Sequence, residues 1–168
     1  MQNLDFQVLC VCLGNICRSP TAEVILEQTA KRAGLEIKVD SAGTSNYHPN
    51  EAPDPRSQHY ALQHGYDLSK LRARQIQIED FERFDLILAM DENNLVDLKN
   101  LANKASNFFG KQSLRASLAL MSEHDKVYPK QAVPDPYYGD AKDFERVIAQ
   151  CESSSQAWIK HWQKNKIG

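Results

Sequence analysis

The fold is decided by the stretch QVLCVCLGNICRSP, residues 7–20. It begins with a short apolar run rich in strand-forming residues, and Gly14 and Asn15 follow soon after that run. Ser19 suits a helix N-cap, and Pro20 suits the first helical position, where a backbone N–H is not needed. The stretch therefore predicts a strand, a tight loop and a helix start in immediate succession.

The segments downstream alternate between strand and helix patterns. A second strand is expected at residues 37–40 and a third at 84–90, whose nearly continuous apolar character is typical of a parallel strand covered on both faces. Residues 114–121 could form a strand or a short helix, and we favour the strand. The expected helices begin at Ser19, Asp54 and Asp91, and a last amphipathic helix covers residues 144–162. This alternation predicts an α/β fold in which helices cover both faces of a parallel sheet.

Size and composition are those of one ordinary soluble domain, which we expect to span residues 1–168. A formal net charge of −2 gives no field that would attract nucleic acid or an anionic membrane, so any anion site must be local. The N-terminus lacks the features of a signal peptide, and no apolar run approaches the roughly 20 residues that span a bilayer. Four cysteines are too few for a disulfide-stapled secreted fold. We therefore expect a cytoplasmic protein with reduced thiols, without nucleic-acid binding or membrane insertion.

The chemistry is expected where Cys12 and Arg18 are separated by five residues. Spacing alone says little, because a chain of this composition contains roughly 0.2 such pairs by chance. The position is more informative, since backbone N–H groups between a buried strand and a helix N-terminus can encircle a phosphate. Gly14 could supply the positive φ that such a concave nest requires, and Arg18 can offer two parallel N–H donors to phosphate oxygens.

The same positive surroundings would favour the thiolate form of Cys12, which is the nucleophilic form. The alternative is that Cys12 is only a small core residue, which is the role we expect for Cys10 and Cys151. The chain contains no G-x-x-x-x-G-K-[ST] pattern, so this loop would carry a nucleophile in place of a lysine. Attack on a phosphate monoester also needs an acid to protonate the departing oxygen.

Residues 11–20, VCLGNICRSP, resemble the signature of the low-molecular-weight protein tyrosine phosphatases. Further similar segments follow in the family's order and approximate spacing, namely VDSAGT at 39–44, ARQI at 73–76, AMDE at 89–92 and DPYYG at 135–139. The resemblance covers essentially the whole chain. It implies a four-stranded parallel sheet with the phosphate-binding loop after strand one, and neither metal nor cofactor. The implied activity is hydrolysis of phosphotyrosine and aryl phosphate monoesters through a cysteinyl-phosphate on Cys12.

The resemblance also implies roles for individual residues. Asp135 would be the general acid and later the base that activates water, although Asp-Pro alone would indicate only a turn. The Ser19 hydroxyl would stabilise the thiolate as a leaving group, while Asn15 and Ser41 would hold the loop in shape. The simpler alternatives are an N-cap for Ser19, a left-handed turn position for Asn15 and a turn residue for Ser41. Rings of Tyr47 and Tyr137 would flank the substrate, or be ordinary surface tyrosines. The remaining phosphate-loop positions are Leu13, Gly14, Ile16 and Cys17.

Two features concern support and regulation of that loop. Many animal members carry a histidine before the position of Arg74 that joins the Asn15 network, and this chain reads SKLR at residues 69–72 instead. We expect the chemistry to survive, because the histidine only supports the loop. Cys17 could capture an oxidised Cys12 as a disulfide, or it could simply pack within the loop.

Three other functions compete with this interpretation. Thioredoxin-coupled arsenate reductases of the same fold need a further pair of cysteines, and only Cys151 lies distant from the loop here. Phosphoarginine phosphatases of related bacteria place threonine where this chain has Ile16. A catalytically dead phosphate-binding module would not need Cys12, Arg18 and Asp135 together. The expected partners are phosphotyrosine proteins, with a bacterial tyrosine kinase as one candidate.

Overall fold

The computed structural model describes residues 2–165, so the outer limits of the expected domain, residues 1 and 168, lie outside the described residues. Four strands, β1 (Gln2–Cys12), β2 (Leu35–Gly43), β3 (Leu86–Ala89) and β4 (Ser117–Leu120), form one sheet in the order β2-β1-β3-β4. All three strand pairings are parallel, which confirms the predicted four-stranded sheet. The segment 114–121, for which a strand was favoured over a short helix, contains the strand β4.

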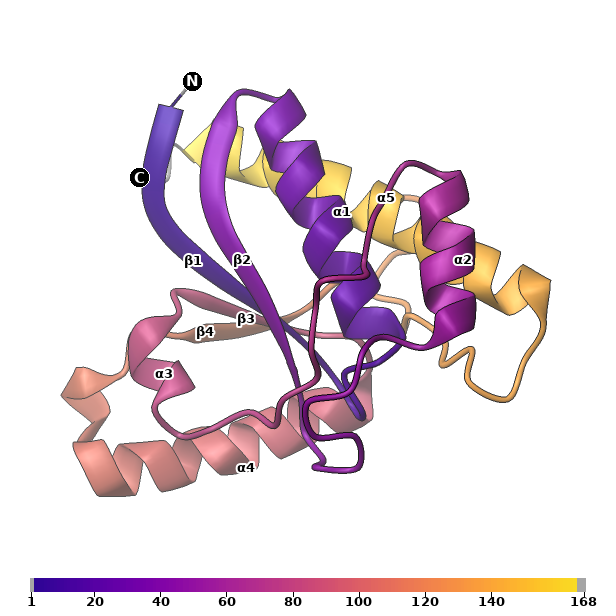
Figure 1. Ribbon diagram of the computed structural model, residues 1–168. Helices are drawn as coiled ribbons and strands as arrows, with labels where there is room; N and C mark the ends of the chain where they lie inside the picture. Colours follow the sequence, from indigo (N-terminus) through magenta and orange to yellow (C-terminus); the bar gives the residue numbers. More distant parts are fainter. Residues whose placement is uncertain (1, 166–168) are drawn as a thin grey trace.

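Helices cover both faces of the sheet, as predicted (Figure 1). One face carries α1 (Arg18–Arg32), α2 (Pro55–Gln63) and α5 (Ala141–Asn165), and the other carries α3 (Asp80–Arg83) and α4 (Glu92–Phe109); a short 3₁₀ helix, η1 (Lys111–Ser113), follows α4. Along β1, Val8 and Cys10 pack on the α1 and α5 side, while Leu9 and Val11 pack on the α4 side. Successive side chains of a strand point to opposite faces, and both faces are covered here, so β1 is continuously apolar over residues 8–11. Among the described residues, no helix is long and apolar enough to cross a membrane.

The helix starts agree with the sequence pattern in two cases. Asp54 accepts a hydrogen bond from the backbone of Arg56 at 2.8 Å and Pro55 opens α2, while Asp91 accepts from the backbone of Asn94 at 2.8 Å at the start of α4. Both carboxylates satisfy N–H groups that the first helical turn leaves without partners.

Other local predictions were wrong or too short. Helix α1 begins at Arg18 with Cys17 at the N-cap, so Ser19 lies inside the helix and is not its cap. Ser41 lies on β2, which extends beyond 37–40 at both ends, and therefore it is not a turn residue. The reason is tertiary in both cases, because both hydroxyls are bonded to groups around Cys12, described below.

The strand order places the carboxyl end of β1 between its neighbours β2 and β3. The chain leaves β1 toward β2 and later returns to the other side of β1 through β3. Ligands of open α/β sheets bind at such a reversal of strand order, beyond the carboxyl ends of the strands. The segment that follows β1 at this point is the Cys12 loop, residues 12–18.

Candidate active site

The outer side of the Cys12 loop is bound to the end of β2. The Cys12 carbonyl accepts a hydrogen bond from the Thr44 N–H at 2.9 Å. At Gly43 a Cβ would lie 2.6 Å from the Leu13 carbonyl oxygen, so a side chain at this position would collide with the loop backbone. No local sequence pattern predicts this close approach, because it is a contact between segments far apart in the chain. The carbonyls of Cys12 and Leu13 thus face the segment that follows β2.

The inner side of the loop presents backbone N–H groups. The Asn15 N–H donates to the Cys12 sulfur at 3.2 Å. The positive φ of the loop, 58°, belongs to Asn15 and not to Gly14, which corrects the sequence prediction; asparagine tolerates this left-handed region better than most residues. Five further N–H groups donate no hydrogen bond to any described residue, those of Leu13, Gly14, Ile16, Cys17 and Arg18. With the N-terminus of α1, they make a concave site suited to an anion.

A hydrogen-bonded network of side chains lies beneath the Cys12 sulfur, which is almost fully buried. The sulfur lies 3.0 Å from the Ser19 hydroxyl, and that hydroxyl accepts a hydrogen bond from the Asn15 side-chain amide at 2.8 Å. The same amide donates to the Ser41 hydroxyl at 3.0 Å. The Ser19 oxygen accepts from Asn15, and the Ser19 proton has two acceptors within reach, the Cys12 sulfur at 3.0 Å and the Ala42 carbonyl at 3.4 Å.

The Asn15 network is complete without the histidine found in many animal relatives. The Asn15 side-chain oxygen accepts a hydrogen bond from the backbone N–H of Arg74 at 3.0 Å, and its two amide hydrogens serve Ser19 and Ser41. In the stretch 69–72, which contains no histidine, Arg72 is exposed and donates to the carbonyls of Ser69 and Leu71. The loop geometry is therefore supported by backbone in place of an imidazole.

Arg18 points its guanidinium toward the carboxyl ends of β1 and β3. Its Nη1 lies 2.6 Å from the Asp91 carboxylate and donates to the Val133 carbonyl at 3.2 Å, and Nη2 lies 3.8 Å from the Asp135 carboxylate. Burial by itself lowers the pKa of Arg18, but the negative charges of the Cys12 thiolate and the Asp91 carboxylate raise it more, so the net pKa lies above its usual value. The guanidinium is a permanent cation in the site.

Sequence reasoning found only the helix-capping role of Asp91. One carboxylate oxygen caps α4 through Asn94, while the other holds Arg18. The available signal was its position, since Asp91 follows β3, the neighbour of β1, and carboxyl ends of parallel strands meet at one edge. The same carboxylate therefore fixes a helix and orients the cation.

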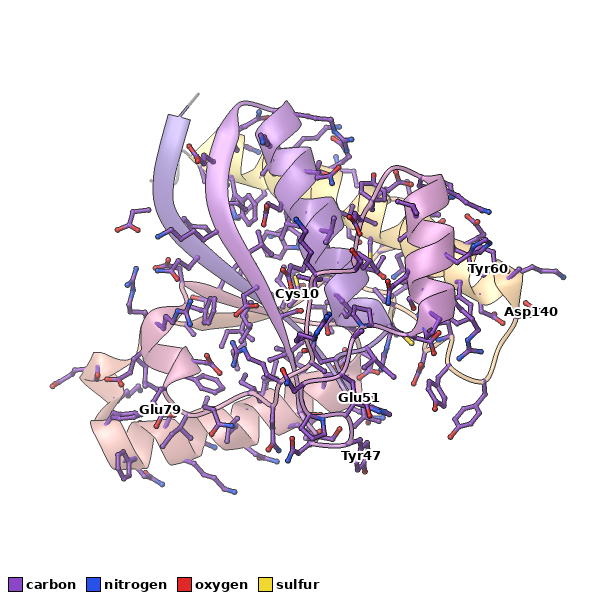
Figure 2. All side chains as sticks on the ribbon, in the orientation of Figure 1. Cys10, Tyr47, Glu51, Tyr60, Glu79 and Asp140 are labelled. Carbon is purple, nitrogen blue, oxygen red and sulfur yellow. The ribbon has the colours of Figure 1, made fainter. Side chains whose placement is uncertain are left out.

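A pocket of about 240 Å³ opens over Cys12. The Asp135 carboxyl and the rings of Tyr47 and Tyr137 line it, together with His48 and Tyr138, which the sequence interpretation missed. Figure 2 shows Tyr47 in the loop after β2, where Glu51 is also labelled. Leu13, Gly14, Ile16, Cys17 and Arg18 complete the lining. The structure thus brings the predicted substrate-facing residues together, whereas Asn15, Ser19 and Ser41 lie beneath the loop.

The other cysteines differ from Cys12 in their surroundings. Cys10 and Cys151 belong to the core between the sheet and the helices α1 and α5, as expected (Figure 2 labels Cys10). Burial raises the pKa of both thiols, that of Cys151 to about 12. Burial also raises the pKa of Cys17 to about 12, although a hydrogen bond with Ser57 opposes the shift. These three residues are therefore thiols at neutral pH.

The arrangement has the parts that cleavage of a phosphate ester requires. A sulfur nucleophile lies beside a ring of N–H donors, a guanidinium can bind two oxygens, and the Asp135 carboxyl lies at the pocket wall, 47% exposed. Such donors stabilise negative charge on a transferring phosphoryl group. The site can therefore bind a phosphate ester with its phosphorus facing the sulfur.

Comparisons with known proteins found similar chains in sequence and in structure. The profile of the family described as low molecular weight phosphotyrosine protein phosphatase matches residues 7–167. A human protein of that description is 41% identical over 155 residues, which cover 91% of this chain and 93% of the human one. A crystal structure of a protein tyrosine phosphatase from Entamoeba histolytica has a TM-score of 0.85 and 32% identity, covering 97% of this chain and 100% of that one. A Drosophila arginine phosphatase has a TM-score of 0.83 and 31% identity, covering 93% of this chain and 97% of that one.

Proposed function

Since the chain belongs to the low molecular weight phosphotyrosine protein phosphatase family, whose members are phosphoric monoester hydrolases, we propose that it hydrolyses protein phosphotyrosine through a cysteinyl-phosphate on Cys12. The observation that carries the mechanism is the placement of the Cys12 sulfur. It contacts the Ser19 hydroxyl at 3.0 Å and the Asn15 N–H at 3.2 Å, at the base of a pocket that Arg18 and Asp135 also line. Both contacts stabilise a thiolate there.

In the first step, the Cys12 thiolate attacks the phosphorus and forms the S–P bond. The P–O bond to the tyrosine oxygen breaks, and its electron pair leaves with that oxygen. The carboxyl group of Asp135 gives its proton to the oxygen, so that tyrosine leaves as a neutral phenol. The loop N–H groups and the Arg18 guanidinium stabilise the charge on the phosphoryl oxygens.

In the second step, the Asp135 carboxylate takes a proton from a water molecule that attacks the phosphorus. The S–P bond breaks, inorganic phosphate forms and Cys12 returns as the thiolate. The Ser19 hydroxyl supports this departure, because it lies 3.0 Å from the leaving sulfur and can donate its proton to it while its oxygen accepts from Asn15. The two steps leave the enzyme unchanged and consume one water.

The pocket wall supports phosphotyrosine as the substrate. The rings of Tyr47 and Tyr137 lie on different loops of the pocket, and Tyr138, 96% exposed, stands beside Tyr137 with ring centroids 4.9 Å apart. An aryl group entering between them gains aromatic contacts that an alkyl phosphate cannot make. Phosphotyrosine is also long enough to carry its phosphate to the buried sulfur.

Phosphoarginine is the second candidate substrate, because the Drosophila arginine phosphatase resembles this chain at a TM-score of 0.83. Against it, Ile16 lines the pocket with an apolar side chain that offers no hydrogen-bond acceptor to a guanidinium leaving group. The test measures kcat/KM for one peptide sequence carrying either phosphotyrosine or phosphoarginine. We expect a higher kcat/KM for the phosphotyrosine peptide, and a smaller difference between the two peptides in Ile16→Thr. A higher kcat/KM of the wild type for the phosphoarginine peptide would reverse the assignment.

A further inference from the structure

Arg56, in the first turn of α2, is bound to the loop that carries Asp135. Its Nη2 donates a hydrogen bond to the Tyr137 carbonyl oxygen at 2.9 Å. The guanidinium carbon lies 5.6 Å from the centroid of the Tyr137 ring and 4.8 Å from that of Phe144. A single side chain therefore holds both the backbone and the ring of Tyr137.

The Tyr137 backbone in turn orients the Asp135 carboxyl. The N–H of Tyr137 donates to Asp135 Oδ1 at 3.1 Å, while the Tyr137 carbonyl is the group that accepts from Arg56. Rotation of the Tyr137 backbone would thus disturb both contacts at once. Through this one residue, the position of the Arg56 guanidinium governs the direction of the Asp135 side chain.

Arg56 is itself fixed by Asp54, a buried carboxylate. Its Nε and Nη2 donate to the two Asp54 carboxylate oxygens at 3.1 and 2.9 Å, which is the bidentate geometry that arginine forms with carboxylates. Burial by itself raises the pKa of Asp54, but the hydrogen bonds from Arg56 lower it more, so the net pKa lies below its usual value. The pair stays charged at neutral pH.

Asp54 is also attached to the Cys12 loop. Its backbone N–H donates to the Ile16 carbonyl at 2.8 Å. A continuous path of contacts therefore runs from Ile16, through Asp54 and Arg56, to Tyr137 and Asp135. This path sets the position of the Asp135 carboxyl relative to the loop that holds the phosphate.

The Asp135 loop, residues 134–139, has few other anchors. Its remaining internal hydrogen bond runs from the Gly139 N–H to the Pro136 carbonyl at 2.8 Å. Among the described residues, Arg56 makes the one hydrogen bond that enters this segment from outside, because Arg18 stands 3.8 Å from Asp135. Apart from the buried Pro136 and the half-buried Pro134 the loop is exposed, so Arg56 is its hydrogen-bonded link to the Cys12 side of the site.

We propose that Arg56 is a positioning residue for the general acid, holding the Asp135 loop in register with the Cys12 loop. The inference rests on the proposed function, in which Asp135 protonates the leaving oxygen. Arg56 touches neither the substrate nor the reacting atoms. Misplacement of a catalytic group by about 1 Å can cost roughly 10²-fold in rate, so loss of this anchor acts on the step that needs the acid.

The test compares kcat/KM across aryl phosphates whose leaving groups differ in basicity, because kcat/KM reports the step in which the leaving group departs. In Arg56→Gln, we expect kcat/KM to fall by about tenfold or more for basic phenols and little for para-nitrophenol, while inhibition by inorganic phosphate stays unchanged. Arg56→Lys keeps the positive charge but cannot form the two parallel hydrogen bonds to Asp54. It should show the same selective loss of kcat/KM for basic phenols, but a smaller one. A merely structural role would lower the active fraction equally for every substrate.

Two further variants make the outcomes separable. Arg83→Gln is the matched control, because Arg83 ends α3 on the other face of the sheet, with its guanidinium 4.9 Å from the centroid of the Phe84 ring. It should leave the slope of log kcat/KM against leaving-group pKa as in the wild type. In an Asp135→Ala background, Arg56→Gln should change the slope no further. A steeper slope in Asp135→Ala with an unchanged slope in both Arg56 variants overturns the positioning role and leaves the acid assignment standing. An unchanged slope in Asp135→Ala overturns both.

Discussion

The carboxylate of Asp135 lies 3.8 Å from the guanidinium of Arg18, so the proposed acid and the phosphate-binding cation face each other across the same pocket. A phosphate ester bound by Arg18 would bring its leaving oxygen to the Asp135 side of the site. The distance exceeds that of a hydrogen bond, so Asp135 Oδ2 is available to a substrate oxygen while Oδ1 accepts from the Tyr137 N–H.

The first prediction follows from this geometry. Asp135→Ala should lower kcat/KM by about 10²–10⁴ for aryl phosphates with basic leaving groups, and far less for good ones, because protonation matters most when the departing oxygen is basic. A plot of rate against leaving-group basicity provides the measurement. Asp140→Ala, at the start of α5, is the control and should retain the wild-type slope; a wild-type slope in Asp135→Ala would remove Asp135 from the acid role.

The second prediction concerns Glu23, which is buried in α1 and accepts a hydrogen bond from the Ser41 hydroxyl at 2.6 Å. Burial raises its pKa from 4.5 to about 7, against the effect of that hydrogen bond. Below pH 4.5 both the folded and the unfolded chain hold the proton. As the pH rises from there to about 7, the unfolded chain releases it first, so the wild type loses stability relative to Glu23→Gln, by on the order of 3 kcal/mol.

Chemical denaturation of wild type and Glu23→Gln at several pH values between 4.5 and 7.5 measures this effect. The difference in unfolding free energy between the two proteins should shift steadily over that range and level off above it. Glu36→Gln, an exposed change on β2, should show no such shift. Parallel pH curves for wild type and Glu23→Gln would contradict a buried, protonated Glu23.

The third prediction concerns oxidation. Peroxide should convert the Cys12 thiolate to a sulfenic acid, which Cys17 then captures as a disulfide with release of water. Because the pKa of Cys17 is about 12, Cys17 should not be oxidised on its own. Mass spectrometry of treated protein should find the Cys12–Cys17 link, with activity restored by a thiol. Overoxidised Cys12 without that link would mean that Cys17 only packs within the loop.

The fourth prediction tests the aromatic wall. Phosphotyrosine peptides should exceed matched phosphoserine peptides in kcat/KM by at least about tenfold, because each aromatic contact contributes about 0.5–1.5 kcal/mol. Tyr137→Ala should reduce that preference roughly two- to tenfold and spare small activated esters. Tyr128→Ala, a ring outside the pocket, is the control. Equal kcat/KM for the two peptide classes in the wild type would refute the tyrosine assignment and leave the cysteine chemistry standing.

The parts of the fold that were predicted correctly depend on local patterns. The apolar run of β1 predicts its own strand. Asp54, Pro55 and Asp91 determine helix starts through contacts with the next two or three residues, so these elements can be read from neighbouring residues alone. Ser19 shows the limit of such reasoning. A hydroxyl just before Pro20 looks like a helix cap, but α1 begins at Arg18 and the Ser19 hydroxyl contacts the Cys12 sulfur instead.

The parts of the site that were missed depend on contacts between distant segments. Asp91 could be recognised as a cap from its neighbours, whereas its contact with Arg18 needs β1 and β3 side by side. The bonds of Arg56 to Tyr137 and the approach of Gly43 to the Cys12 loop have the same origin. Family resemblance assigns the reacting residues, but it does not tell which side chains hold them in place.

The central claim is that phosphate passes through a covalent bond to Cys12. Rapid quenching during turnover of a radiolabelled phosphotyrosine peptide, followed by mapping of the labelled residue, tests it most directly. The wild type should carry labelled phosphate on Cys12. Cys12→Ser should bind phosphate analogues but carry no label, because the hydrogen-bond partners of this side chain are a hydroxyl and an N–H, neither of which is a base that could ionise serine. Active wild-type enzyme that never carries label, or label retained in Cys12→Ser, would contradict the covalent mechanism.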